Sequence, residues 1–201
     1  SGNYAYVADD NNGLVIIDIS NPAIPSIHAT QNTSGSARGV EINGSHAYVA
    51  DGNNGLAIID ISTPGTPSIL ATKNTNGFAM GIDISGSYAY IADGSLGLPS
   101  GSGLAIIDIS NPASPGIPVY KGGIGQARGV EVIGSYAYLA TSSNFSIIDI
   151  SDPANPGTPV NRSTSNGYGI EVEGNYAYVS DDVIGLRVFS INGGSIKNAG
   201  A

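Results

Sequence analysis

The sequence predicts an all-β fold assembled from about five repeated units, and three observations lead to this prediction. First, a phrase like "GSHAYVADGNNGLAIIDIS" (44–62) recurs at 2–20, 86–110, 134–151 and, less well kept, 174–191. Second, 29 Gly and 11 Pro among 201 residues are typical of short strands joined by tight turns. Third, no stretch carries the apolar spacing of an amphipathic helix, so we expect no helix longer than one turn.

The length of the repeat indicates the architecture. The phrase starts at Gly2, Gly44, Gly86, Gly134 and Gly174, in steps of 42, 42, 48 and 40 residues. A period near 40 residues with four strands per unit is typical of a blade of a β-propeller. A single blade cannot bury both of its faces, so each one needs neighbours. We therefore predict one domain over 1–201, with the repeat units 2–43, 44–85, 86–133, 134–173 and 174–201.

Four antiparallel strands fit into each repeat, as the second copy illustrates. Residues 38–43 alternate between apolar and polar side chains, and residues 46–51 do so again. A loop rich in Gly and Asn then leads into the dense apolar run 56–62, which is typical of a strand buried on both faces. Proline cannot continue a central strand, so the run ends at a Pro-rich turn, and 68–73 form the outermost strand.

The strand count predicts that the first blade is incomplete. The chain opens with a second-type strand at 3–9, so it holds five second and five third strands. It holds only four inner strands, at 38–43, 80–85, 128–133 and 168–173. The tail 194–201 follows a third strand and should run antiparallel to it as an outer strand. The first blade should therefore lack its inner strand and present an adhesive edge. A longer chain or another polypeptide could supply that strand, or the terminal blades could meet within or between chains.

Four of the copies carry a common apolar motif. It reads "GLVIIDISNP" (13–22), "GLAIIDISTP" (55–64), "GLAIIDISNP" (103–112) and "FSIIDISDP" (145–153). Together with the preceding Tyr-Ala-Tyr strand, this motif resembles the LVIVD repeat over nearly the whole chain. The resemblance implies a β-propeller of the bacterial or archaeal surface or secreted type, with no common catalytic activity. The fifth copy departs from it, because Ser190 replaces the Asp and the Pro-rich turn is missing.

Charge and composition exclude several classes of partner. The formal net charge is −9, which would repel nucleic acid and anionic membrane surfaces. No apolar run approaches the ~20 residues of a membrane span, so we expect no membrane insertion. The chain has no Cys, which excludes disulfides, thiolate metal sites and Cys nucleophiles.

Two sets of Asp residues recur at fixed places. Asp18, Asp60, Asp108 and Asp149 precede the Pro-rich turns, and each carboxylate can accept a backbone N–H of its turn. Asp9, Asp10, Asp51, Asp93, Asp181 and Asp182 open the hairpin loops. We interpret this second set as turn formers. Ca²⁺ is the alternative for this set, but the spacing lacks the closing acid of a calcium loop. No other cofactor and no metal site is expected.

The remaining recurrent side chains belong to the second and inner strands. Nine tyrosines lie in the Tyr-Ala-Tyr strands, where packing between blades is favoured over a glycan-binding surface. The inner strands carry Glu41, Asp83, Glu131 and Glu171 at one equivalent position, which should line an axial channel. These carboxylates could hold a cation or ordered water. Alternatively, Arg38 and Arg128, three residues earlier, could pair with Glu41 and Glu131.

A candidate binding face is indicated by residues that differ between the copies. Equivalent positions before a Gly hold Arg38, Met80, Arg128 and Tyr168. Lys73 and Lys121 lie beside the same loops, which run from an outer strand to the next inner strand. The third hairpin loop (93–103) is six residues longer than its counterparts, and such loops often carry recognition.

The function that these observations favour is a non-catalytic extracellular or cell-surface propeller acting as a structural or adhesive module. Its partner would be a protein or a glycan, or a second copy meeting it through the terminal blades. The alternative is a subunit of a self-assembling surface filament or sheath. An enzyme or a carbohydrate-binding protein with a site on the loop face is a weaker interpretation. No G-x-S-x-G elbow or metal-binding His pair is present, and no catalytic residue can be named.

Overall fold

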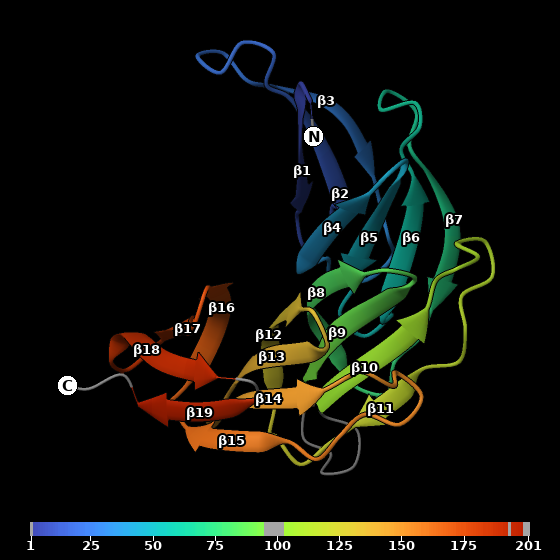
Figure 1. The fold of residues 1–201 in the computed structure, drawn as a ribbon. Coiled ribbons are helices and arrows are strands. Elements are labelled where there is room, and N and C mark those ends of the chain that lie inside the picture. Colours follow the sequence, from blue (N-terminus) through green and yellow to red (C-terminus); the bar gives the residue numbers. More distant parts are fainter. Residues whose placement is uncertain (1, 95–102, 193, 199–201) are drawn as a thin grey trace.

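The protein consists of five antiparallel sheets that lie side by side as the blades of a propeller (Figure 1). The structure is a computed structural model and describes residues 2–94, 103–192 and 194–198. Within these ranges every regular element is a strand and no helix occurs. The predicted all-β propeller of five blades is confirmed.

The strands of each blade follow one another in the chain. The first blade contains β1 (Tyr4–Ala8), β2 (Leu14–Asp18) and β3 (Ser26–Gln31). The second contains β4 (Gly39–Asn43), β5 (His46–Ala50), β6 (Leu56–Asp60) and β7 (Ser68–Lys73). The third contains β8 (Phe78–Ser85), β9 (Tyr88–Gly94), β10 (Gly103–Asp108) and β11 (Val119–Lys121). The fourth contains β12 (Ala127–Ile133), β13 (Tyr136–Thr141), β14 (Asn144–Asp149) and β15 (Val160–Ser163). The fifth contains β16 (Gly167–Glu173), β17 (Tyr176–Asp181), β18 (Gly185–Asn192) and β19 (Ser195–Asn198).

The first blade has three strands in the described part of the chain, in the order β1-β2-β3. The strand that it lacks is the inner one, as predicted from the strand count. In the fifth blade β19 pairs antiparallel with β18, so the tail forms an outer strand, again as predicted.

Glycine sets the tight turn between the inner and second strands of a blade. Gly44 and Gly134, for example, each begin a two-residue loop with a φ of 59°. A positive φ at this position matches the twist of the flanking strands, and glycine adopts it at no steric cost. The same glycine begins every copy of the repeated phrase, which explains why the phrase starts where it does.

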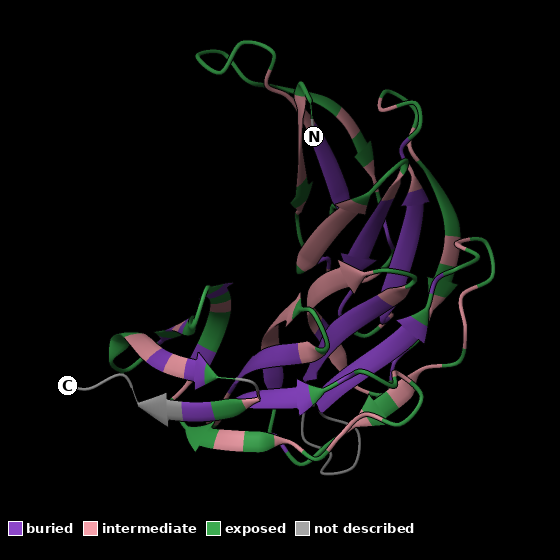
Figure 2. Cartoon of the chain, in the orientation of Figure 1, coloured by how far each residue is buried: buried purple, intermediate pink, exposed green. Residues whose placement is uncertain are grey.

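The core lies between the blades rather than within one of them (Figure 2). We call the face of a blade toward the preceding blade its leading face and the opposite one its trailing face. The leading face of the second blade consists of Ala47, Val49, Ala57 and Ile59, which pack with Leu14 and Ile16 of the first blade. The trailing face consists of Tyr48, Ala50, Leu56 and Ile58, which pack on Ala89, Ile91, Ala105 and Ile107 of the third. Successive residues of a strand therefore supply two different interfaces.

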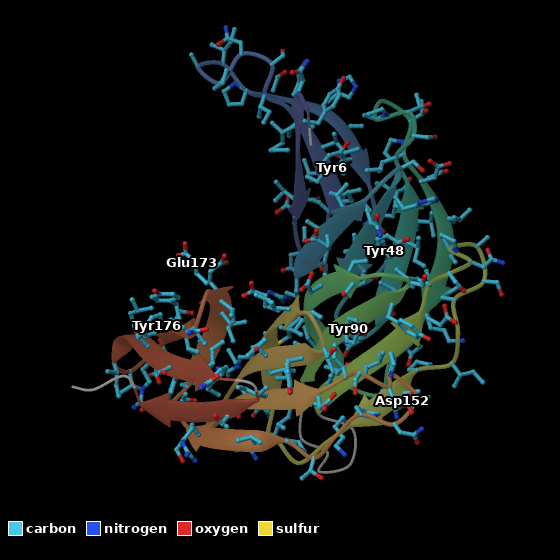
Figure 3. The ribbon with its side chains drawn as sticks, in the orientation of Figure 1. Tyr6, Tyr48, Tyr90, Asp152, Glu173 and Tyr176 are labelled. Carbon is cyan, nitrogen blue, oxygen red and sulfur yellow. The ribbon has the colours of Figure 1, made fainter. Side chains whose placement is uncertain are left out.

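The tyrosines of the second strands belong to this packing. Tyr6, Tyr48 and Tyr90 occupy equivalent positions on three consecutive blades (Figure 3). Tyr48, Tyr90 and Tyr138 are buried in the last three of the four interfaces between blades. The equivalent Tyr178 of the last blade is only half-buried, and Tyr176, which begins the same strand, is exposed. Most of the repeated tyrosines are thus packing residues, and no tyrosine surface spans the blades.

The five blades form an open arc, and the first and fifth blades lie apart at its two ends (Figure 1). The terminal blades therefore do not meet within one chain. The angle between successive blades leaves the leading face of the first blade and the trailing face of the fifth without a neighbouring blade in the described structure.

Candidate functional site

A pocket of about 330 Å³ lies at the beginning of the inner strands, across the second to fifth blades. It is lined by Arg38, Phe78, Met80, Gly94, Gln126, Arg128 and Tyr168. Two guanidinium groups thus share one hollow with two aromatic rings and a thioether.

Close contact between the inner strands brings these side chains together. Each lining residue Arg38, Met80 and Arg128 precedes a glycine whose Cα lies against the backbone of the next blade. A Cβ on Gly81 would lie 2.7 Å from the carbonyl oxygen of Arg128, and one on Gly129 would lie 2.6 Å from that of Tyr168. Because only glycine permits such an approach, the inner strands pack in a row, and the preceding side chains gather at one end of it.

β-Bulges then direct two of the side chains. The pairing of β8 with β9 shifts register between Ala79 and Gly81, and that of β12 with β13 shifts between Ala127 and Gly129. Met80 and Arg128 are therefore the extra residues of the two bulges. A bulge bends the strand and changes the direction of its side chain, which is why bulges are frequent beside binding sites.

The two arginines are held differently. The Arg38 guanidinium lies over the Phe78 ring at 5.6 Å and forms an ion pair with Asp10 at 3.5 Å, between two substantially exposed side chains. The Arg128 guanidinium lies 4.2 Å from the centre of the Tyr168 ring and donates to Asn166 Oδ1 at 2.5 Å. It also donates to the Gly167 carbonyl at 3.4 Å. All described partners of Arg128 are thus neutral, and no carboxylate in the described ranges forms an ion pair with it.

Four of the six residues expected on the binding face line this pocket: Arg38, Met80, Arg128 and Tyr168. Lys73 and Lys121 do not, because they end the outer strands β7 and β11 at the periphery of their blades. The inserted part of the loop 93–103 lies outside the described residues between positions 95 and 102.

Sequence reasoning missed Phe78, Gln126 and Gly94. Phe78 and Gln126 stand two residues before Met80 and Arg128, so they are equivalent to each other. Asn166, which accepts from Arg128, is the same position in the fifth blade. A comparison of the copies at this second position would have found them, because it differs between the copies as much as the position before the Gly does.

The four inner-strand carboxylates do not pair with the arginines of their own blades. Arg38 and Arg128 reach the contacts described above, so the expected local pairs with Glu41 and Glu131 are absent. Asp83 instead accepts the N–H of Val132 in the next blade at 2.6 Å and that of Ile84 at 2.7 Å. The Oε2 atom of Glu131 is buried and has no described hydrogen-bond partner.

Burial and mutual repulsion change the acidity of this row. The pKa of Glu131 is raised to about 7, first by burial and then by the nearby Glu171 and Asp83. Burial also raises the pKa of Glu41, with Asp83 adding to the effect. Glu41 and Glu131 therefore hold their protons more readily than isolated glutamates would. Among the described residues, no group of three or more His, Cys, Asp or Glu side chains is arranged to hold a metal ion.

The carboxylates before the Pro-rich turns each accept a backbone N–H two residues ahead. The distance is 2.8 Å from Asp18, Asp60 and Asp108 to Ser20, Ser62 and Ser110, and 2.9 Å from Asp149 to Ser151. These backbone hydrogen bonds lower the pKa of all four carboxyl groups. The side chains thus fix the start of the turn that joins the third to the outer strand.

Two of the hairpin Asp residues have a role beyond the turn that they help to form. Asp51 and Asp93 are fully buried and accept the hydroxyls of Thr33 at 2.5 Å and Thr75 at 2.8 Å. Both threonines lie in the loop that enters the same blade from the outer strand of the preceding one. The carboxylates therefore tie the entry loops to the hairpins, and they fix the loops beside the pocket.

The fold and the pocket together define a class of protein: an open-arc β-propeller with a small cationic and aromatic pocket on its loop face. The LVIVD repeat matches five segments of the chain, at residues 1–33, 34–75, 76–118, 124–163 and 166–191. These segments cover most of the sequence, and the chain belongs to the LVIVD repeat family.

Solved structures of low sequence identity share the fold. A functionally unknown protein from Desulfotomaculum acetoxidans is 20% identical with a TM-score of 0.71, over 98% of this chain and 68% of that one. The periplasmic gluconolactonase PpgL of Pseudomonas aeruginosa is 13% identical with a TM-score of 0.81, over 98% and 67%. The computationally designed protein Ika8 is 9% identical with a TM-score of 0.69, over 98% of this chain and 58% of its own.

These likenesses establish the fold alone, and the chain spans only part of each of the three structures. A comparison with curated proteins found no match. None of the described elements is a helix long and apolar enough to cross a membrane.

Proposed function

We propose that this chain is a non-catalytic recognition module that binds a partner through the loop-face pocket. The ligand group is a carboxylate attached to an apolar, preferably planar body, presented by a protein or a glycan. The observation that carries the proposal is Arg128, a cation in the pocket whose described contacts are all neutral.

The anionic part of the ligand is inferred from the geometry of the guanidinium groups. Arg128 is oriented by Asn166 and by the ring of Tyr168, so little freedom is lost when it binds. A planar guanidinium donates two parallel hydrogen bonds to a carboxylate, which a lysine cannot do. Arg38 adds a second positive charge that is only partly compensated by the exposed Asp10.

The apolar part is inferred from the other lining residues. Phe78, Met80 and Tyr168 present two rings and a flexible thioether. Aromatic rings and methionine accommodate flat apolar groups of differing shape. A pocket near 330 Å³ is large enough for one side chain or one sugar, which fits a recognition module better than a polymer-binding groove.

The lining also supports a non-catalytic role. Its described residues include no carboxylate and no imidazole that could act as a general base beside a bound substrate. The inner-strand acids belong to a separate row, and none of them lines the pocket.

Binding of benzoate, followed by NMR chemical shifts or calorimetry, tests the proposal, with benzamide as the uncharged counterpart. Benzoate should bind at least tenfold more tightly than benzamide, because only the carboxylate can pair with Arg128. The variant R128Q should reduce the affinity for benzoate about tenfold, since charge-assisted hydrogen bonds contribute on the order of 1.5–3 kcal/mol.

The matched control is R162Q, which removes an exposed arginine on the outer strand β15, away from the pocket lining. It should leave the affinity for benzoate unchanged. Equal binding of benzoate and benzamide, or equal losses in R128Q and R162Q, would contradict the proposal.

The proposal includes an extracellular or cell-surface location. Cleavage of the protein by protease added to intact source cells would support this location, whereas full protection until lysis would contradict it.

A further inference from the structure

The leading face of the first blade carries the same kinds of residue as the leading faces that are buried between blades. Ala5, Val7, Val15 and Ile17 lie on it, because they alternate with the residues that face the second blade. The equivalent residues of the second blade are Ala47, Val49, Ala57 and Ile59, and those of the third are Ala89, Ile91, Ala105 and Ile107. All eight of these are fully buried against a preceding blade. On the first blade Val7 is 39% exposed and Ala5 and Ile17 are half-buried, while Val15 is buried within the blade's own surroundings at 6%.

The trailing face of the fifth blade shows the matching pattern. It carries Tyr178, Ser180, Leu186 and Val188 where the second blade has Tyr48, Ala50, Leu56 and Ile58. Leu186 is 62% exposed, whereas Leu56 and Leu104 at the same position are fully buried under the next blade. Three of the four positions thus keep an apolar or tyrosine side chain although no described blade covers them.

These two faces are the two halves of one recurrent interface. Within the chain, a trailing face of Tyr, Ala, Leu and Ile packs on a leading face of Ala, Val or Ile, Ala and Ile. At the positions of the first set the fifth blade presents Tyr, Ser, Leu and Val, and at those of the second set the first blade presents Ala, Val, Val and Ile. Surface positions without a partner tolerate polar residues, so the retained apolar residues at both ends indicate that both are covered.

We propose that the chain associates head to tail with a second copy, the trailing face of the fifth blade packing on the leading face of the first blade of its neighbour. Because the ends of one arc lie apart, a single chain cannot make this contact with itself. The interface joins two different surfaces, so each added copy presents a new end for the next one. The inference stands on the end faces and is independent of the loop-face pocket.

Sedimentation of the wild-type chain over a wide concentration range is the first measurement. Species heavier than one chain should form, and their share should rise with concentration. The variants V7K and L186E each place a charge in one half of the interface, and each should sediment as a single chain. Far-UV spectra and melting temperatures establish that both variants remain folded.

An equimolar mixture of the two variants gives the decisive result. V7K keeps an intact fifth blade and L186E keeps an intact first blade, so one sound interface can form between them. The mixture should contain pairs of chains and nothing larger. The control is V160K, because Val160 is 39% exposed like Val7 but lies on the outer strand β15. V160K should assemble like the wild type.

Three results would overturn the inference. The wild type could remain a single chain at every concentration. L186E alone could assemble like the wild type, which would indicate a symmetric contact between first blades. The mixture of V7K and L186E could stay as single chains, which would mean that the two faces do not bind each other.

Discussion

The inner strands carry a row of four carboxylates, Glu41, Asp83, Glu131 and Glu171. The charges of two of them act on Glu131. Its nearest described charges are Glu171 and Asp83, and its buried Oε2 atom has no described hydrogen-bond partner. The raised pKa follows from these surroundings: the charged form is poorly solvated and is repelled by its neighbours. The same surroundings make the stability of the protein depend on pH.

We expect the protein to unfold at a lower temperature at pH 8 than at pH 5. The pKa of Glu131 is about 7 in the folded chain and near 4.5 when unfolded. Below pH 4.5 the carboxyl group is protonated in both states. Between pH 4.5 and 7 the unfolded chain releases this proton while the folded chain keeps it, so the folded state loses stability across this range and regains none of it above pH 7. The variant E131Q should raise the melting temperature at pH 8 by a few degrees. This shift corresponds to a gain in the free energy of unfolding on the order of 1 kcal/mol after solvent screening.

The control for this prediction is E173Q, which removes one charge at an exposed position on the neighbouring strand β16 (Figure 3). It should change the melting temperature little at either pH. If E131Q and E173Q had the same effect, the pH dependence would come from net charge and not from the environment of Glu131.

At the residue scale, the sequence predicted which side chains lie in one row better than it predicted which side chains contact each other. Equivalence between the copies identified Arg38, Met80, Arg128 and Tyr168 correctly as one row. It could not tell that Arg128 stacks on Tyr168 rather than pairing with Glu131, because the bulge at Arg128 turns its side chain toward the next blade. A side-chain contact between two packed blades cannot be predicted from the spacing of residues along a single strand.

Among the elements, the inner strands decide how the blades meet. Gly39, Gly81 and Gly129 each touch the backbone of the following inner strand, at the carbonyl of Met80, Arg128 or Tyr168. Gly169 is the equivalent residue of the fifth blade and has no following blade, and a Cβ there would meet only the hydroxyl of Ser180 at 3.1 Å. The same glycine therefore has different consequences in different blades.

Substitution of these glycines by alanine provides a direct test of the packing. G81A should lower the free energy of unfolding by about 1–3 kcal/mol, because the new methyl group must displace a backbone carbonyl. G169A should lower it by less than G81A does, because the Ser180 hydroxyl, which accepts the Gly169 N–H at 2.7 Å, needs only a small shift and no backbone carbonyl must be displaced. Denaturant unfolding measures both. Equal losses in the two variants would mean that the inner strands do not pack as described.

The strand boundaries show how far local patterns reach. The outer strand predicted at 68–73 coincides with β7, because a Pro-rich turn and a Gly/Asn loop limit it on both sides. The inner strand predicted at 80–85 begins earlier, at Phe78, because the bulge between Ala79 and Gly81 interrupts the alternation but not the pairing. A pattern of period two does not reveal a strand that continues through a bulge.

At the scale of the molecule, the repeat predicted the number of blades and the missing inner strand. The strand types could be counted from sequence, and each blade needs one strand of each type. The open arc could not be predicted, because the angle between blades depends on side chains packed between two sheets. The described structure shows this angle, and with it the two apolar end faces.

Hydrogen exchange measured strand by strand tests most directly whether the first blade is three-stranded and the arc open. The strands β5, β9 and β13 have paired neighbours on both sides, whereas β1 pairs with β2 alone. In an antiparallel edge strand every second N–H points away from its partner. We predict that alternate amides of β1 exchange rapidly while those of β5, β9 and β13 are protected. Uniform protection of β1, equal to that of β5, would contradict the account, because another strand would then occupy the inner position.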